Sequence, residues 1–194
     1  MSVRWGAVCR PKQGQEISGD TYVLANPGDG QVLAAVIDGL GGGAEAARAA
    51  RTAEALFREH AHYPLQDLIR QSHAALHTTR GAVAGLLRLE TAGSAASFVG
   101  VGNIGVHVYS RRPIKPISKN GILGYRLPNL LELRYTYDPG DVFVLYSDGV
   151  SGQFARDTQI DLAMEPQQIA DLILERYGKH SDDATVLVVK TSAL

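Results

Sequence analysis

Residues 32–56, VLAAVIDGLGGGAEAARAARTAEAL, carry an apolar strand into a run of glycines and then into an alanine-rich helix. Residues 39–44, GLGGGA, formally satisfy the G-x-G-x-x-G/A pattern of dinucleotide-binding domains. Such a domain needs a second parallel strand after the helix, with an acidic residue about 20 positions on. Here a second helical pattern follows, and Glu59 lies within the first one. The context therefore argues against a dinucleotide site and directs attention to Asp38, which ends the strand.

Composition places the chain among ordinary globular proteins. Its 194 residues are 45% hydrophobic and 20% charged, which predicts one domain over residues 1–194. Because 19 basic residues face 20 acidic ones, no overall field favours nucleic acid or an anionic membrane. Cys9 is the single cysteine, so an internal disulfide is excluded and a reducing compartment is favoured. No window reaches the roughly 18 apolar residues of a spanning helix, and we expect a soluble cytoplasmic protein.

Strands are predicted at the beginning of the chain. Apolar segments at 3–10, 21–26 and 32–38 have strand character, and PGDG at 27–30 predicts a hairpin between the last two. Helical spacing begins at Ala44, and the many alanines indicate a helix very close to its neighbour. A second helix is predicted with Pro64 in its first position and with a stripe of apolar residues at helical spacing, namely Leu65, Leu68, Ile69, Leu76 and Val83.

The second half returns to strands. Segments 95–110, 130–137 and 141–149 are rich in Val, Tyr and Phe and are separated by Gly, Pro and Asn. A last helix is predicted from Pro166 to Gly178, before a final strand at 184–190. This order is not the strict alternation of a parallel sheet, so we predict a layered α+β domain.

Aspartates recur at the predicted ends of strands. Asp148 repeats the construction of Asp38, an apolar strand followed by Asp-Gly, while Asp20 and the pair Asp182 and Asp183 precede strands. Asp-Gly is also a common turn dipeptide, and a single loop aspartate is often only solvated or capping. Several carboxylates brought within a few Å would raise one another's pKa and repel unless a cation neutralised them. The set therefore predicts a metal site, and oxygen ligands favour Mg²⁺ or Mn²⁺.

Histidine gives no evidence for zinc. His73 and His77 have i, i+4 spacing, but HAALH lacks the glutamate of a zinc-protease helix. We expect these two histidines to be surface or partly packed residues. His180, two residues before Asp182, is the one histidine expected to reach the aspartates.

Four motifs, taken in order, resemble one family. SGD (18–20), VIDGLGGG (36–43), YSDG (146–149) and SDDATVLVV (181–189) span almost the full length. Together they resemble the metal-dependent PP2C-type serine/threonine phosphatases. Leu40, the glycines after it and the alanine-rich helix are similar to the bacterial SpoIIE-like branch, and in particular to its small stand-alone stressosome phosphatases.

The resemblance implies a fold and a centre. The expected fold is a four-layer αββα sandwich, two antiparallel sheets flanked by helices, with a binuclear Mn²⁺ or Mg²⁺ centre at one edge. Asp38 would bridge both ions, the Gly39 carbonyl would bind the second, and Asp148 and Asp182 would complete the shell of the first. These three aspartates are the expected catalytic residues, acting through a metal-activated water. Asp20 matches the early acidic position of the family.

Three positions differ from the main branch of the family. Asp183 stands where the main branch often has Asn, so we expect it to support the ligands from outside. Leu40 replaces a histidine proposed as a proton donor, and no phosphate-gripping arginine lies close before Asp20. We therefore expect phosphate to be held mainly by metals and the leaving group to be protonated by water, or less readily by His180.

The resemblance also implies partners. The expected substrates are phosphorylated STAS-domain scaffold proteins of a stressosome-like complex, positioned by docking. Residues 110–129, which carry basic residues and prolines, are the segment expected to contact them, although a plain connecting loop is an equal alternative. A catalytically weak or inactive binding module is the alternative function.

Overall fold

The computed structural model describes residues 1–193, in which nine strands, three α-helices and one 3₁₀ helix occur. In chain order the elements are β1 (Ser2–Arg10), β2 (Asp20–Gly28), β3 (Gln31–Gly39), α1 (Gly43–Glu59), α2 (Leu65–Ala75), β4 (Ala82–Glu90), β5 (Ala95–Val101), β6 (Gly105–Tyr109), β7 (Leu133–Thr136), β8 (Val142–Tyr146), η1 (Gly152–Arg156), α3 (Pro166–Tyr177) and β9 (Ala184–Ser192).

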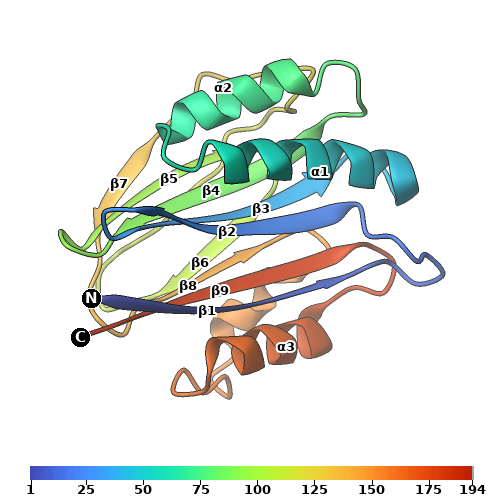
Figure 1. The fold of residues 1–194 in the computed structure, drawn as a ribbon. Coiled ribbons are helices and arrows are strands. Elements are labelled where there is room, and N and C mark those ends of the chain that lie inside the picture. Colours follow the sequence, from blue (N-terminus) through green and yellow to red (C-terminus); the bar gives the residue numbers. More distant parts are fainter. Residues whose placement is uncertain (194) are drawn as a thin grey trace.

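Two antiparallel sheets lie face to face. One has the strand order β1-β9-β8-β6 and the other β2-β3-β4-β5-β7. Helices α1 and α2 cover the outer face of the five-stranded sheet, and α3 covers the outer face of the other (Figure 1). The predicted α+β sandwich of two antiparallel sheets flanked by helices is thus confirmed.

Three apolar clusters hold the four layers together. One joins α1 and α2 to the five-stranded sheet, one fills the space between the sheets, and one joins α3 to the four-stranded sheet. On β3, side chains alternate between the first cluster (Leu33, Ile37) and the second (Ala34, Val36). This alternation follows from the two-residue period of a strand. Both faces of β3 are buried because each is covered by another layer.

The β2–β3 hairpin fixes the relative position of two aspartates. Its turn residues Asp29 and Gly30 have φ angles of 51° and 68°, and a two-residue turn of this kind suits Asp-Gly. Pairing continues along the ladder, through a bulge between Ala25 and Gly28, to Asp20 opposite Asp38. The predicted hairpin is confirmed, and the far end of its ladder carries both carboxyls.

The alanine-rich helix lies very close to β3, as predicted. A Cβ atom on Gly39 would overlap the carbonyl oxygen of Ala46, so this crossing requires glycine. The buried alanines of α1, which include Ala46 and Ala50, face the sheet. Among residues 1–193, no helix has both the length and the apolar character needed to cross a bilayer.

The predicted extent of the second helix was wrong. Helix α2 ends at Ala75, and Val83 lies instead in β4, a central strand that pairs with β3 and β5. Residues 82–89 are all buried, because β4 has a helix layer on one face and the second sheet on the other. Such a strand shows no polar alternation. Pro64 is the residue that precedes α2 rather than its first helical residue.

Candidate metal centre

The predicted site residues gather where the two sheets meet at one end. Asp20 begins β2 and Asp38 lies near the end of β3, both in the five-stranded sheet. Asp148 follows β8 and Asp182 precedes β9, in the other sheet. Asp38, Asp148 and Asp182 line one cavity of ≈ 610 Å³. The topology therefore brings together three aspartates from three distant segments of the chain.

The same cavity has a second wall of small and polar residues. Its other lining residues are Leu40, Gly41, Val83, Gly102, Asn103, Ser118, Asn120, Gly121 and Ile122. Four of them, Ser118 and 120–122, belong to the segment 110–129 in which substrate contact is expected. Leu40 lines the cavity together with Asp38, so an apolar side chain stands two residues after that carboxyl. Sequence reasoning did not identify Asn103 as a member of the site.

Burial and mutual repulsion disfavour ionisation of two of the carboxyls. Burial is the main cause that raises the pKa of Asp38, and the charges of Asp20, Asp148 and Asp182 raise it further. Burial likewise raises the pKa of Asp20, while nearby hydroxyl groups partly oppose the rise. Asp20 Oδ2 is buried and has no hydrogen-bond partner among the described residues. A buried carboxylate oxygen of this kind needs a positive partner to be ionised at neutral pH.

Asp148 and Asp182 are half-buried and are oriented by hydrogen bonds. Asn103 Nδ2 donates to Asp148 Oδ2 over 2.7 Å. Asp182 Oδ1 accepts the Asp183 backbone N–H at 3.0 Å. Each aspartate has one carboxylate oxygen for which no such bond is recorded in residues 1–193. Both side chains are therefore directed while keeping oxygen available to a ligand.

Asp183 fastens the N-terminal loop to the last strand. It is 4% exposed, and its Oδ1 and Oδ2 accept the backbone N–H groups of Lys12 (2.9 Å) and Gly19 (2.8 Å). The Gly39 N–H in turn donates to the Gly19 carbonyl at 3.0 Å. Asp183 thus acts on Asp20 and Gly39 through the backbone next to them, the geometry of an outer support.

The histidines are divided between two places. Gly124 N–H donates to His73 Nδ1 at 3.1 Å, and His77 Nδ1 is 2.7 Å from the Gly124 carbonyl. The two rings therefore hold the loop around Gly124 against α2, as partly packed surface residues do. His180 is exposed, and its carbonyl accepts the Gln13 N–H at 2.9 Å.

The donor set fits a divalent, oxygen-preferring cation. The carboxylates of Asp20, Asp38, Asp148 and Asp182 and the Gly39 carbonyl are hard oxygen donors of the kind that Mg²⁺ and Mn²⁺ bind. Within the part of the chain that is described, no three acidic, His or Cys side chains converge on one point. Backbone oxygen and water must therefore supply part of any coordination shell, which is usual for Mg²⁺.

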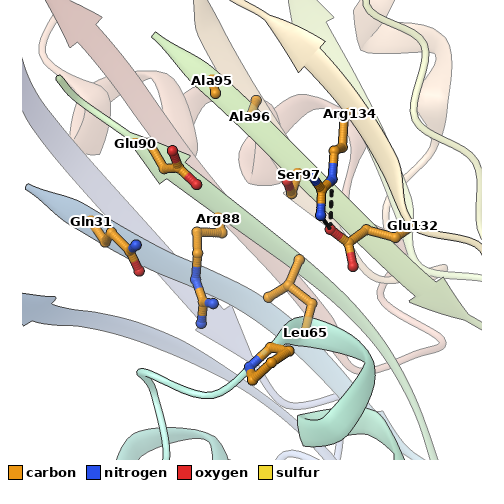
Figure 2. A pocket seen from close by; sticks show the side chains of 10 residues that line it. Gln31, Leu65, Arg88, Glu90, Ala95, Ala96, Ser97, Glu132 and Arg134 are labelled. Atoms are coloured by element: carbon orange, nitrogen blue, oxygen red, sulfur yellow. Dashed lines mark hydrogen bonds and ion pairs between the residues drawn. The ribbon is translucent and has the colours of Figure 1, made fainter. Parts of the chain in front are cut away.

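Figure 2 shows a second cavity. It lies at the end of β3 where Gln31 pairs with Glu90, away from Asp38. Its ≈ 260 Å³ are lined by residues that include Gln31, Arg88, Glu90, Glu132 and Arg134. Arg134 pairs with Glu132, and the largely buried Arg88 donates to the Ala61 carbonyl. Two arginines and two glutamates balance one another there, and Arg88 joins the α1–α2 connection to the sheet. We assign this cavity a structural role.

Comparison with known proteins gives consistent matches. The family model for stage II sporulation protein E (SpoIIE) matches residues 28–192. The phosphoserine phosphatase RsbX of Bacillus subtilis (strain 168) is 24% identical over 183 residues, which cover 93% of this chain and 91% of RsbX.

Solved structures match over nearly the whole chain. A chain from work on the bacterial stressosome, a modular system adapted to control secondary messenger signalling, is 33% identical with a TM-score of 0.89, covering 98% of this chain and 100% of that one. The crystal structure of RsbX in complex with magnesium has a TM-score of 0.84 at 22% identity, covering 98% and 96%.

Proposed function

We propose, from the premise that the chain belongs to the SpoIIE family of PP2C-type phosphatases, that it removes phosphate from phosphoserine or phosphothreonine of bacterial stress-signalling proteins. The observation that carries the proposal is the convergence of Asp38, Asp148 and Asp182 on one cavity, beside the buried Asp20. Their mutual repulsion favours a bound cation, and hydrolysis of a phosphomonoester is chemistry that such a centre would support.

Each residue has a definite task in this proposal. Asp38, the Gly39 carbonyl, Asp148 and Asp182 would hold Mn²⁺ or Mg²⁺, with Asp20 adjoining Asp38 across the hairpin. Bound ions of this kind supply Lewis-acid activation of water and positive charge beside the phosphoryl oxygens. No side-chain nucleophile is needed. Asn103 directs Asp148, and Asp183 holds the Gly19 backbone from outside.

Proton transfer to the leaving group falls to water. Leu40 lines the cavity and has no proton to donate, and His180 is exposed on the loop before Asp182. The enzyme should therefore be slow, because a positioned general acid typically contributes about 10²–10⁴-fold.

Similarity to RsbX and to the stressosome chain supports the choice of substrate. We infer that the substrates are phosphorylated STAS-domain scaffold proteins of a stressosome-like complex. Ser118 and residues 120–122, on the cavity wall, belong to the segment through which they would dock.

Mass spectrometry of a phosphorylated STAS-domain protein tests the function. Wild-type protein with Mn²⁺ should remove the phosphate, and Asp38→Asn should slow this by roughly 10³-fold or more because an ion ligand is lost. Asp67→Asn is the matched control, since Asp67 is half-exposed, its side chain pairs only with Arg70, and it lies far from the cavity in sequence and element. Full Mn²⁺-dependent activity of Asp38→Asn would sink the proposal.

One observation favours an alternative, a weak or inactive binding module. Leu40 stands beside Asp38 where the family's proton donor is expected. An inactive module should bind Mn²⁺ poorly and hydrolyse nothing, so calorimetry with Mn²⁺ alongside the hydrolysis assay separates the two functions.

A further inference from the structure

Arg80 lies beside Gly41, one of the residues that line the aspartate cavity. It is exposed, in the connection between α2 and β4. Its Nη1 atom is 2.8 Å from the point that a Cβ atom on Gly41 would occupy. Gly41 has a φ of 92° and lines the cavity together with Asp38. Glycine at 41 thus serves two purposes: it adopts the left-handed conformation and leaves room for the guanidinium.

The backbone on both sides of Arg80 is held to the cavity walls. Gly81 accepts a hydrogen bond from the Leu40 N–H at 3.0 Å, and its own N–H donates to Thr79 Oγ1 at 3.0 Å. Tyr125 donates its hydroxyl to the Thr79 carbonyl at 3.1 Å. Leu40 belongs to the wall that carries Asp38, and Tyr125 to the segment 110–129. Arg80 therefore projects from a fixed base rather than from a loose loop.

The guanidinium of Arg80 is available for an anion. Among the described residues, no acidic side chain forms an ion pair with it. Two other cations near the site donate to backbone oxygens: Lys179 Nζ donates to the Asp148 carbonyl at 2.6 Å, and Arg10 donates to the Lys179 carbonyl. The exposed Lys119, between the cavity residues Ser118 and Asn120, is the rival cation that the test must exclude. A phosphoryl group brings a charge of about −2, and the planar fork of arginine matches its oxygens in two-bond geometry.

We propose that Arg80 binds the phosphoryl group of the substrate and positions it over the aspartate cavity. The proposal rests on the function proposed above and modifies the expectation that phosphate is held mainly by metals. The phosphate-binding arginine is thus assigned to the α2–β4 connection, beside Gly41, rather than to the segment before Asp20.

Two substitutions at Arg80 test the proposal. Arg80→Ala should lower kcat/KM on a phosphoserine protein by about 10- to 100-fold, the range for losing charge-assisted hydrogen bonds. Arg80→Lys should recover only part, because lysine offers a point charge without the fork. Mn²⁺ affinity, measured by calorimetry, should stay within about twofold. Arg70→Ala, a change at an exposed arginine paired with Asp67, is the matched control.

Inorganic phosphate supplies a readout that does not depend on turnover. Binding of phosphate to the Mn²⁺-loaded protein, measured by calorimetry, should weaken about 10-fold or more in Arg80→Ala. If phosphate binds the wild type more tightly than Arg80→Ala but the wild type hydrolyses no phosphoprotein, the proposed function is wrong and the phosphate site at Arg80 is still supported. Wild-type kcat/KM and phosphate affinity in Arg80→Ala would overturn the inference. Lys119 lies between Ser118 and Asn120. If Lys119→Ala lowers both kcat/KM and phosphate affinity while Arg80→Ala lowers neither, the inference about Arg80 is also overturned.

Discussion

Replacing Asp183 by Asn separates a structural carboxylate from a metal ligand. Both oxygens of Asp183 accept backbone N–H groups, from Lys12 and Gly19, across 171 and 164 positions of sequence. An Asn side chain keeps one acceptor oxygen but presents its NH₂ group to the other N–H. One hydrogen bond to a charged group is then lost, and a buried donor is left opposite another donor.

The expected loss of stability follows from that exchange. Hydrogen bonds to charged groups contribute about 1.5–3 kcal/mol, and an unpaired buried donor costs about 1–3 kcal/mol. Part of this is offset, because the charge of Asp183 is among the causes that raise the pKa of Asp20 and its removal eases their repulsion. We expect a net loss of about 2–3 kcal/mol in the free energy of unfolding. For a chain of this size, that corresponds to a fall in Tm of roughly 4–12 °C.

The assay is thermal or urea unfolding with a chelator present, so that no ion contributes. Asp161→Asn is the control: Asp161 is exposed and accepts only the N–H of Ala163, within its own loop, so its change should stay within about 0.5 kcal/mol. If Asp183 instead binds ions directly, the Asp183→Asn protein should be at least as stable as the wild type when a chelator is present, and only its Mn²⁺ affinity should be reduced. That result would refute the reasoning.

Three further outcomes are expected. The folded-state pKa values of Asp20 and Asp38 are raised from 3.8 to about 6 and about 8. In the presence of a chelator, the protein should therefore lose stability as pH rises from about 4 to about 8. Unfolding measured across this range checks the slope, and Asp38→Asn should make the slope shallower. Gly39→Ala should cost roughly 1–3 kcal/mol by forcing α1 away from β3, whereas Gly93→Ala, with open space around it, should be near neutral in the same urea titration. Asn103→Ala should weaken Mn²⁺ binding roughly 10-fold, as measured by calorimetry, and unchanged affinity would contradict its supporting role.

The layered α+β fold was predicted correctly from the sequence, but the central strand β4 of the five-stranded sheet was not. The hairpin, the alanine-rich helix and the last helix carry local turn, spacing and capping signals, and these predictions are confirmed. Strand β4 carries none: its burial on both faces removes alternation, so Val83 seemed to extend a helical stripe. Burial on both faces depends on the other layers and cannot be seen in a short window.

The candidate site shows the same division between local and distant information. Aspartates at the ends of strands could be predicted, because Asp-Gly after an apolar run is a local signal. The two hydrogen bonds of Asp183 and the approach of Arg80 to Gly41 join segments far apart in sequence, and the motifs that contain Asp183 and Gly41 do not indicate these contacts. These contacts depend on the register of the strands and on the positive φ angle of Gly41, which cannot be read from a short stretch of sequence.

The pairing of the first strand with the last has a consequence for biosynthesis. β1 lies along β9, with Ser2 opposite Ser192 (Figure 1). A nascent chain can assemble the hairpin and α1 early, but β1 has no strand beside it, and the loop at Lys12 has no anchor, until β9 emerges from the ribosome. The aspartate cavity is therefore completed only after β9 has been synthesised. A partly synthesised chain would expose β1 as an open edge for aggregation or chaperones, and it would possess no enzymatic activity to release prematurely.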